Sequence, residues 1–184
     1  MKILYRLATD ADLDDILAVQ TLNLKILLGS SLSEEVLTAL VINQEKKRDR
    51  QRELIFIAIC NGKVIGFIAL LLNSARITGL FVHPDFVQQG IGSELLTIAI
   101  DVLDSKKHRT IFAWSFDSAK AFYRKHGFHS SRSNYLLLGR HLKVRTFWMR
   151  KTIRPLTEIE QKRNTIITAI IISLILVSLI TSLS

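Results

Sequence analysis

Apolar residues in the first 150 or so positions of the chain recur with two periods. Alternating or continuous apolar runs predict strands, and apolar residues spaced three and four apart predict helices. The predicted strands cover residues 2–8, 54–60, 64–72, 76–82, 110–115, 135–138 and 144–151. The predicted helices cover residues 10–28, 33–50, 92–103 and 118–126. The resulting order, β-α-α-β-β-β-α-β-α-β-β, indicates one α/β domain over residues 1–153.

Polar and glycine positions mark the ends of several of these elements. Thr9 followed by Asp12 is typical of a helix N-cap with an acidic first turn. The pair Asn61-Gly62 between two apolar runs predicts a β-hairpin, because both residues accept positive φ angles. Gly127 is expected to end the fourth helix in a left-handed conformation.

The last part of the chain has a different composition. Residues 165–183 carry no charge and are rich in Ile, Leu and Val. As a helix they would extend about 28 Å, close to the hydrocarbon thickness of a bilayer. We therefore expect a transmembrane helix after a basic linker at 154–164. The alternatives are a buried helix or an oligomerisation helix of a soluble enzyme.

Charges before this segment predict its orientation. Basic residues outnumber acidic ones there, so the positive-inside rule places residues 1–153 on the cytoplasmic side of the membrane, as in a tail-anchored protein. The basic residues are Arg150, Lys151, Arg154, Lys162 and Arg163, against Glu158 and Glu160.

Composition narrows the class of protein. The 184 residues contain one cysteine, Cys60, which lies in an apolar strand and is interpreted as a buried hydrophobe. The five histidines show no ligand spacing, so we expect no metal site. The net charge of +9 suits a phosphate-bearing ligand or an anionic membrane surface. No nucleic-acid module is recognisable, and the charged run at 45–53 alternates in sign, which favours a solvated helix end.

The segment at 82–96 is the main candidate for binding chemistry. A strand ends, a glycine-bearing turn follows and an apolar-periodic helix begins. Backbone N–H groups of such a turn and the positive end of the helix dipole attract phosphate. A P-loop is excluded because Ser93 and Glu94 follow Gly92, and a dinucleotide fingerprint would need glycine at Leu95.

The same segment resembles motif A of the GNAT acyltransferases. The matching positions are Val82, Pro84, Gly90, Gly92 and the pair Leu95-Leu96. The resemblance implies a mostly antiparallel, twisted sheet that is split at the cofactor site, with backbone amides holding the pyrophosphate of acetyl-CoA. One position departs from the motif. Val87 stands where Gln or Arg is usual, and the lost donor is expected to cost about 1 kcal/mol.

A second block at 118–128 resembles the A-x-x-F-Y-x-x-x-G-F segment of the same family. Ser118 is expected to cap its helix. The resemblance makes Tyr123 the general acid that protonates the leaving thiolate. The sequence does not identify the general base, for which His83, Asp85 and His126 are candidates beside a chain of waters. The resemblance implies these cofactor-binding residues: Phe81, Val82, Gln88, Gln89, Gly90, Ile91, Gly92, Ser93 and Ser118.

We therefore expect a membrane-anchored N-acetyltransferase that moves an acetyl group from acetyl-CoA directly to a primary amine. The alternative is a catalytically inactive CoA-binding module tethered to a membrane. The sequence leaves open whether the acceptor is a small molecule or a protein, which membrane is used, and the oligomeric state, a homodimer included.

Overall fold

The computed structural model describes residues 2–50 and 53–182. The chain divides into two compact units, Met1–Ile153 and Arg154–Ser184. The strands of the first unit are β1 (Leu4–Leu7), β2 (Leu54–Cys60), β3 (Lys63–Leu71), β4 (Arg76–Val82), β5 (Thr110–Ser115), β6 (His129–Leu137) and β7 (Lys143–Thr152). Its helices are α1 (Leu13–Leu28), α2 (Glu34–Arg50), α3 (Ile91–Ser105) and α4 (Lys120–Lys125). The second unit contains α5 (Glu158–Ser182).

The seven strands form one mixed sheet in the order β1-β2-β3-β4-β5-β7-β6. Neighbouring strands are antiparallel, except that β4 and β5 are parallel. This parallel pair is short: Arg76 lies opposite Phe112 and Ile77 opposite Ala113, and no further pairs form between the described strands. Beyond Ile77 the sheet is therefore split. The predicted element order and the predicted split, mostly antiparallel sheet are confirmed.

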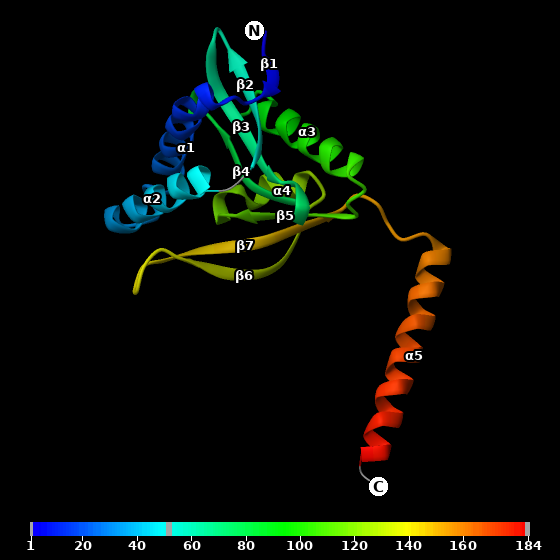
Figure 1. Cartoon of the computed structure of the whole chain (residues 1–184). Coiled ribbons are helices and arrows are strands. Elements are labelled where there is room, and N and C mark those ends of the chain that lie inside the picture. The colour runs from blue at the N-terminus through cyan, green and yellow to red at the C-terminus, as the bar shows by residue number, and fades with distance from the viewer. Residues whose placement is uncertain (1, 51–52, 183–184) are drawn as a thin grey trace. The chain divides into compact units, whose positions relative to one another are not determined.

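Helices cover both faces of the sheet (Figure 1). One face packs against α3 and α4 and includes Leu95, Leu96 and Tyr123 in its core. The other packs against α1 and α2 and includes Ile16 and Leu40. Because side chains alternate between the faces of a strand, β3 contributes to both cores and is almost wholly buried.

Two predicted local signals are confirmed. Asn61 and Gly62 both have positive φ, 49° and 76°, so they form the tight turn between β2 and β3. Gly127 has φ 79°, and the amides of Gly127 and Phe128 bond the carbonyls of Arg124 and Tyr123. This pair of bonds is the Schellman pattern, which turns the chain back toward the core after α4.

Three other expectations need correction. β6 begins at His129, well before the predicted residue 135, because its first residues are polar and exposed on an edge strand that only β7 pairs. The hydroxyl of Ser118 caps no helix, since Phe116 is the N-cap of the 3₁₀ turn that leads into α4. Helix α5 begins at Glu158, inside the predicted linker, where Thr157 and Glu160 form a capping box.

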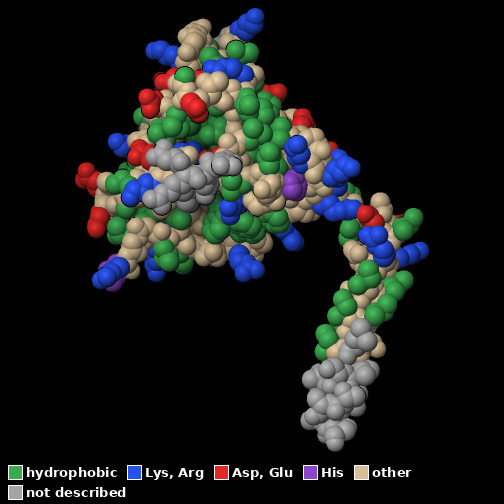
Figure 2. All heavy atoms as spheres, in the orientation of Figure 1, with side chains coloured by type: hydrophobic (Ala, Val, Ile, Leu, Met, Phe, Trp, Pro, Cys, Tyr) green, Lys and Arg blue, Asp and Glu red, His purple; other side chains and the backbone are tan. Residues whose placement is uncertain are grey.

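The second unit is described by itself. The predicted span at 165–183 falls largely in α5, but Leu174 and residues 176–184 lie outside the described side chains. Over the residues that were described, no helix is both long and apolar enough to cross a membrane. The described isoleucines of α5 from Ile166 to Ile175 are exposed, and Figure 2 shows apolar side chains along this part of the helix.

Candidate acyl-donor site and acceptor pocket

The start of α3 offers unpaired backbone donors. Gly90 is the N-cap residue, with φ 83°, a left-handed conformation that glycine adopts without strain. It has no side chain that could cap the helix, and the first helical bond runs from the amide of Glu94 to the carbonyl of Gly90. The amides of Ile91, Gly92 and Ser93 are therefore the free N–H groups of a helix N-terminus, which fits a phosphate group.

The two sequence blocks at 82–96 and 118–128 meet at this helix end. A Cβ at Gly92 would lie 3.5 Å from the ring of Phe122 and 3.6 Å from a methyl group of Val82. Four residues after Phe122, His126 places its Nε2 atom 3.0 Å from Ser93 Oγ. The end of β4, the first turn of α3 and the end of α4 are thus in contact, as the paired motifs predict.

Tyr123 lies in the core beneath this junction. It is 4% exposed, and its ring packs edge-on against Phe122 and Phe128 at centroid distances of 5.5 and 5.3 Å. Burial raises the pKa of the Tyr123 hydroxyl well above its ordinary value of 10.0, so the phenol stays protonated at neutral pH. No hydrogen bond of this hydroxyl is found within the described residues, which leaves its proton available to a substrate.

Backbone groups of Val82 face the split in the sheet. The amide of His83 bonds the carbonyl of Ile65 in β3, and alternate strand residues direct their backbone groups to opposite sides. The N–H and C=O of Val82 therefore point to the side from which β5 has diverged. The side chain of Asn23 in α1 donates to the Val82 carbonyl at 2.7 Å and fixes this strand end. By the same alternation, the backbone of Phe81 faces β3.

A pocket of about 310 Å³ lies on the face of the sheet covered by α1 and α2. Its walls come from α2, β4, β5, the residue after β5, β6 and β7, so it opens at the split. The lining residues are Gln44, Arg76, Thr78, Phe81, Trp114, Phe116, Tyr135, Leu136, Leu137 and Thr146. Four of these side chains are aromatic, and Arg76 is the one charged residue among the described lining residues.

A buried polar cluster supports the β4 wall of this pocket. Arg48 and Glu53 form an ion pair whose side chains are each 1% exposed, and both bond the hydroxyl of Thr78. Arg48 also donates to Gln20 Oε1 at 3.0 Å and to the Thr78 carbonyl at 3.2 Å. A Cβ at Gly79 would collide with the Arg48 guanidinium. The interpretation of residues 45–53 as a solvated helix end is therefore wrong for Arg48 and Glu53, whose side chains are buried.

The register of β4 explains why Thr78 is held in this way. Ala69 pairs with Gly79 and Leu70 with Ile77, so Thr78 is an extra residue on its strand, a β-bulge. The Thr78 hydroxyl oxygen also lies 3.1 Å from the Ala69 carbonyl oxygen. The bulge lies just beyond the last β4–β5 pair, at Ile77, so it accompanies the opening of the split. Sequence reasoning missed this cluster because alternating charges on a helix usually face solvent.

The remaining candidate residues lie in the turn between β4 and α3. Gln88 has φ 62° and is exposed, and Gln89 donates to the carbonyl of Asp85 at 3.3 Å. Val87, which replaces the usual donor of the motif, is 47% exposed. Ser118 is exposed in the turn before α4.

The three candidate bases have other contacts. His83 Nδ1 accepts from the amide of Asp85 at 3.3 Å, so it stabilises the turn, and the Asp85 carboxylate is exposed. His126 uses both ring nitrogens, Nδ1 with the Phe122 carbonyl and Nε2 with Ser93. None of the three is among the described residues that line the pocket. Within the described residues, no group of three or more His, Cys, Asp or Glu side chains could hold a metal ion.

Comparison with known sequences identifies one family. Residues 28–139 match the model described as an acetyltransferase (GNAT) domain, which is more than half of the chain. An uncharacterized N-acetyltransferase of Methanocaldococcus jannaschii is 32% identical over 91 residues. The alignment covers 43% of this chain and 40% of that relative, so the chain spans less than half of the relative's length.

Solved structures share the fold. A GCN5-related N-acetyltransferase from Rhodopseudomonas palustris superposes with a TM-score of 0.75 at 20% identity, over 83% of this chain and 97% of its own. The PaiA N-acetyltransferase of Thermoplasma acidophilum in complex with coenzyme A gives 0.66 at 20% identity, over 83% and 99%. The ribosomal-protein-S18-alanine N-acetyltransferase of Escherichia coli gives 0.58 at 21% identity, over 85% and 97%.

Proposed function

Because the chain belongs to the GNAT acetyltransferase family, we propose that it transfers the acetyl group of acetyl-CoA to a primary amine. The observation that carries the proposal is the junction of the uncapped start of α3 with the split end of β4 and with α4. An anion site, an open strand edge and a buried protonated phenol meet there. The coenzyme A complex of a protein with the same fold supports the identity of the donor.

Each part of the junction has a role in this proposal. The free amides of Ile91, Gly92 and Ser93 hold the pyrophosphate, and Gln88 and Gln89 lie in the same turn. The outward-facing backbone of Val82 pairs with the pantetheine chain and leaves the thioester in the split. The acceptor amine approaches from the pocket on the other face of the sheet, because the split connects the two faces.

The proposed reaction is a direct transfer. The neutral amine attacks the thioester carbonyl, a backbone N–H near the end of β4 stabilises the oxyanion, and the C–S bond breaks as the C–N bond forms. Tyr123 gives its proton to the departing sulfur and regains one from solvent, and solvent water accepts the proton that the amine loses. Water is the acceptor we propose because no carboxylate or imidazole occurs among the described lining residues of the pocket.

The test is release of the CoA thiol from acetyl-CoA by the full chain, measured across a panel of primary amines. Amine-dependent release is expected for at least one member, with an N-acetylated product in equal amount by mass spectrometry. Binding of CoA without release for any amine would contradict the proposal and favour an inactive CoA-binding module.

We also propose that residues 165–183 anchor the domain to a membrane, with residues 1–153 on the cytoplasmic face. Support comes from the uncharged sequence of this segment, from the helix that contains it, and from exposed isoleucines such as Ile170 and Ile171. Carbonate extraction of membranes from cells that express the full chain tests this. Retention in the pellet is expected, whereas release to the supernatant would favour an oligomerisation helix.

A further inference from the structure

We infer that the acceptor is a primary amine that also carries a carboxylate, with the size and apolar character of an aliphatic or aromatic amino acid. The inference rests on the proposed function, and it assigns to Arg76 the selection of that acceptor. Arg76 opens β4, lines the pocket and lies one residue before the last β4–β5 pair, at Ile77. It is therefore placed where the split begins.

The guanidinium of Arg76 has no protein partner in the part of the chain that the structure describes. Its Nε atom is buried and makes no hydrogen bond. A buried donor without an acceptor costs free energy, and a guanidinium binds a carboxylate through two parallel N–H bonds. Arg48 makes the contrast clear, because its guanidinium on the same face is neutralised by Glu53. Arg76 is thus a charged donor that a ligand can satisfy.

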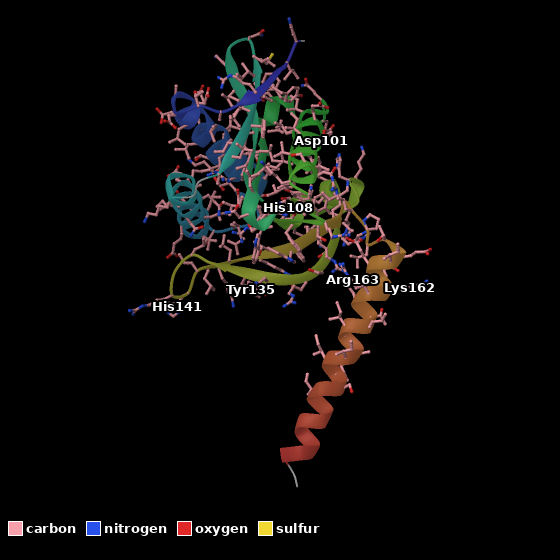
Figure 3. The ribbon with its side chains drawn as sticks, turned by 45° about the vertical axis from the view of Figure 1, so that its right-hand side comes forward. Asp101, His108, Tyr135, His141, Lys162 and Arg163 are labelled. Carbon is pink, nitrogen blue, oxygen red and sulfur yellow. The ribbon has the colours of Figure 1, made fainter. Side chains whose placement is uncertain are left out.

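The rest of the pocket determines what else the ligand must be. Phe81, Trp114, Phe116 and Tyr135 provide aromatic walls, and Tyr135 lies along β6, as Figure 3 shows. Such walls favour an aliphatic or aromatic body. No acidic side chain is found among the described lining residues, so a second ammonium group, as in a polyamine, has no counter-ion there. A volume of about 310 Å³ suits a molecule of amino-acid size.

The positive charge also assists the chemistry. A primary amine attacks only after it loses a proton, and a nearby cation lowers the pKa of an ammonium group. Arg76 therefore binds the carboxylate and favours the neutral, nucleophilic amine in one step. This arrangement compensates in part for a pocket without a described carboxylate or imidazole base.

The test compares acceptors that differ only in the carboxylate: L-leucine against 3-methylbutylamine, and L-phenylalanine against 2-phenylethylamine. With the full chain, kcat/KM for thiol release is expected to be about tenfold or more higher for the acid of each pair, mainly through KM. Arg76→Gln should remove this preference, because KM rises more for the acid than for the bare amine of each pair. Arg76→Lys should keep part of the preference.

The matched control is Arg145→Gln, which removes an exposed charge from β7 outside the pocket lining. It should leave the preference unchanged. An equal or greater rate with the bare amine in the wild-type chain would overturn the inference, as would an equal loss for both members of a pair in Arg76→Gln. In either case amine-dependent thiol release would still uphold the proposed transferase.

A binding measurement separates the inference from the proposed function if no amine supports turnover. Trp114 lines the pocket and is one of two tryptophans in the chain, so its fluorescence reports occupancy in the presence of CoA. A fluorescence change with L-leucine or L-phenylalanine that is absent with the bare amines and lost in Arg76→Gln would support the carboxylate site. No change with either amino acid would overturn it.

Discussion

The Nε2 atom of His126, just after α4, lies 3.0 Å from the hydroxyl oxygen of Ser93, in the first turn of α3. His126 Nδ1 is 2.8 Å from the Phe122 carbonyl, so the ring is held at both nitrogens. The side chain therefore ties the two motif-bearing segments together. We expect Ser93→Ala and His126→Ala each to lower the free energy of unfolding, and their effects to be less than additive by about 1 kcal/mol.

Urea denaturation of the wild type, both single variants and the double variant gives this coupling directly. The cycle cancels the packing that His126→Ala also removes from Phe122, whose ring centroid lies 4.5 Å from the imidazole. Thr97→Ala, one turn further along α3, is a matched control because, within the described residues, its hydroxyl bonds only the carbonyl of Ser93. Strict additivity between Ser93 and His126 would show that their contact contributes nothing to stability.

Substitution of Tyr123 by Phe tests the general acid. We expect kcat to fall about 100-fold or more, because the departing sulfur loses its proton donor. The Kd for CoA should stay within about twofold, since the ring keeps its packing against Phe122 and Phe128. Steady-state kinetics give kcat, and calorimetric titration with CoA gives the Kd. A kcat equal to that of the wild type would exclude Tyr123 as the general acid.

The raised pKa of Tyr123 also predicts how kcat depends on pH. Burial raises this pKa above 10.0, so the acid form persists through the neutral and mildly alkaline range. The kcat of the wild type should therefore show no alkaline decline assignable to Tyr123 below pH 10. Any decline in that range should also occur in Tyr123→Phe, measured on its residual rate.

Much of the fold could be predicted because its signals are local. The Asn61-Gly62 turn, the break at Gly127 and the apolar period of α3 each depend on a few neighbouring residues. The beginning of β6 could not be predicted in this way. Its polar residues are exposed, and their strand conformation comes from backbone pairing with β7, which no hydrophobic period records.

The candidate site shows the same difference between local and long-range signals. The proposed donor half lies in two contiguous motifs, so the sequence alone predicts Gly90, Gly92 and Tyr123 as members of it. The proposed acceptor half is assembled from side chains far apart in the chain. Arg76 in β4 and Tyr135 in β6 line one pocket because the two strands belong to one sheet, although β5 and β7 lie between them. The burial of Arg48 likewise depends on Thr78 and Glu53, which come from later segments.

Substitution of Val87 by glutamine is expected to raise the affinity for CoA. Val87→Gln restores the donor that motif A usually carries beside the pyrophosphate site, and one added hydrogen bond contributes about 1 kcal/mol. The Kd for CoA is therefore expected to fall about fivefold, with little change in Tm because the side chain is exposed. Val87→Ala, which adds no donor, serves as the control in the same calorimetric titration. Equal affinities for all three chains would indicate that position 87 does not face the ligand.

Stability at low pH should depend on Asp12. Arg6 donates to both carboxylate oxygens of Asp12 at 2.8 Å, and the amide and hydroxyl of Thr9 donate to the same group at 2.7 and 2.8 Å. These bonds, with that of Arg6 the largest cause, hold the pKa of Asp12 well below its ordinary value of 3.8. A lowered pKa in the folded state stabilises the fold above pH 3.8, and this stabilisation is lost as the pH falls further.

Thermal unfolding of Asp12→Asn between pH 2 and pH 7 tests this dependence. The variant should have a lower Tm than the wild type at pH 7, and the difference should shrink below about pH 3.8, where the wild-type carboxylate begins to lose its advantage. Asp14→Asn, the same change at an exposed carboxylate two residues further on, should leave the wild-type pH dependence in place. A Tm difference for Asp12→Asn that is constant across the range would mean that the charge of Asp12 contributes nothing, and that the loss comes from hydrogen bonds an amide cannot replace.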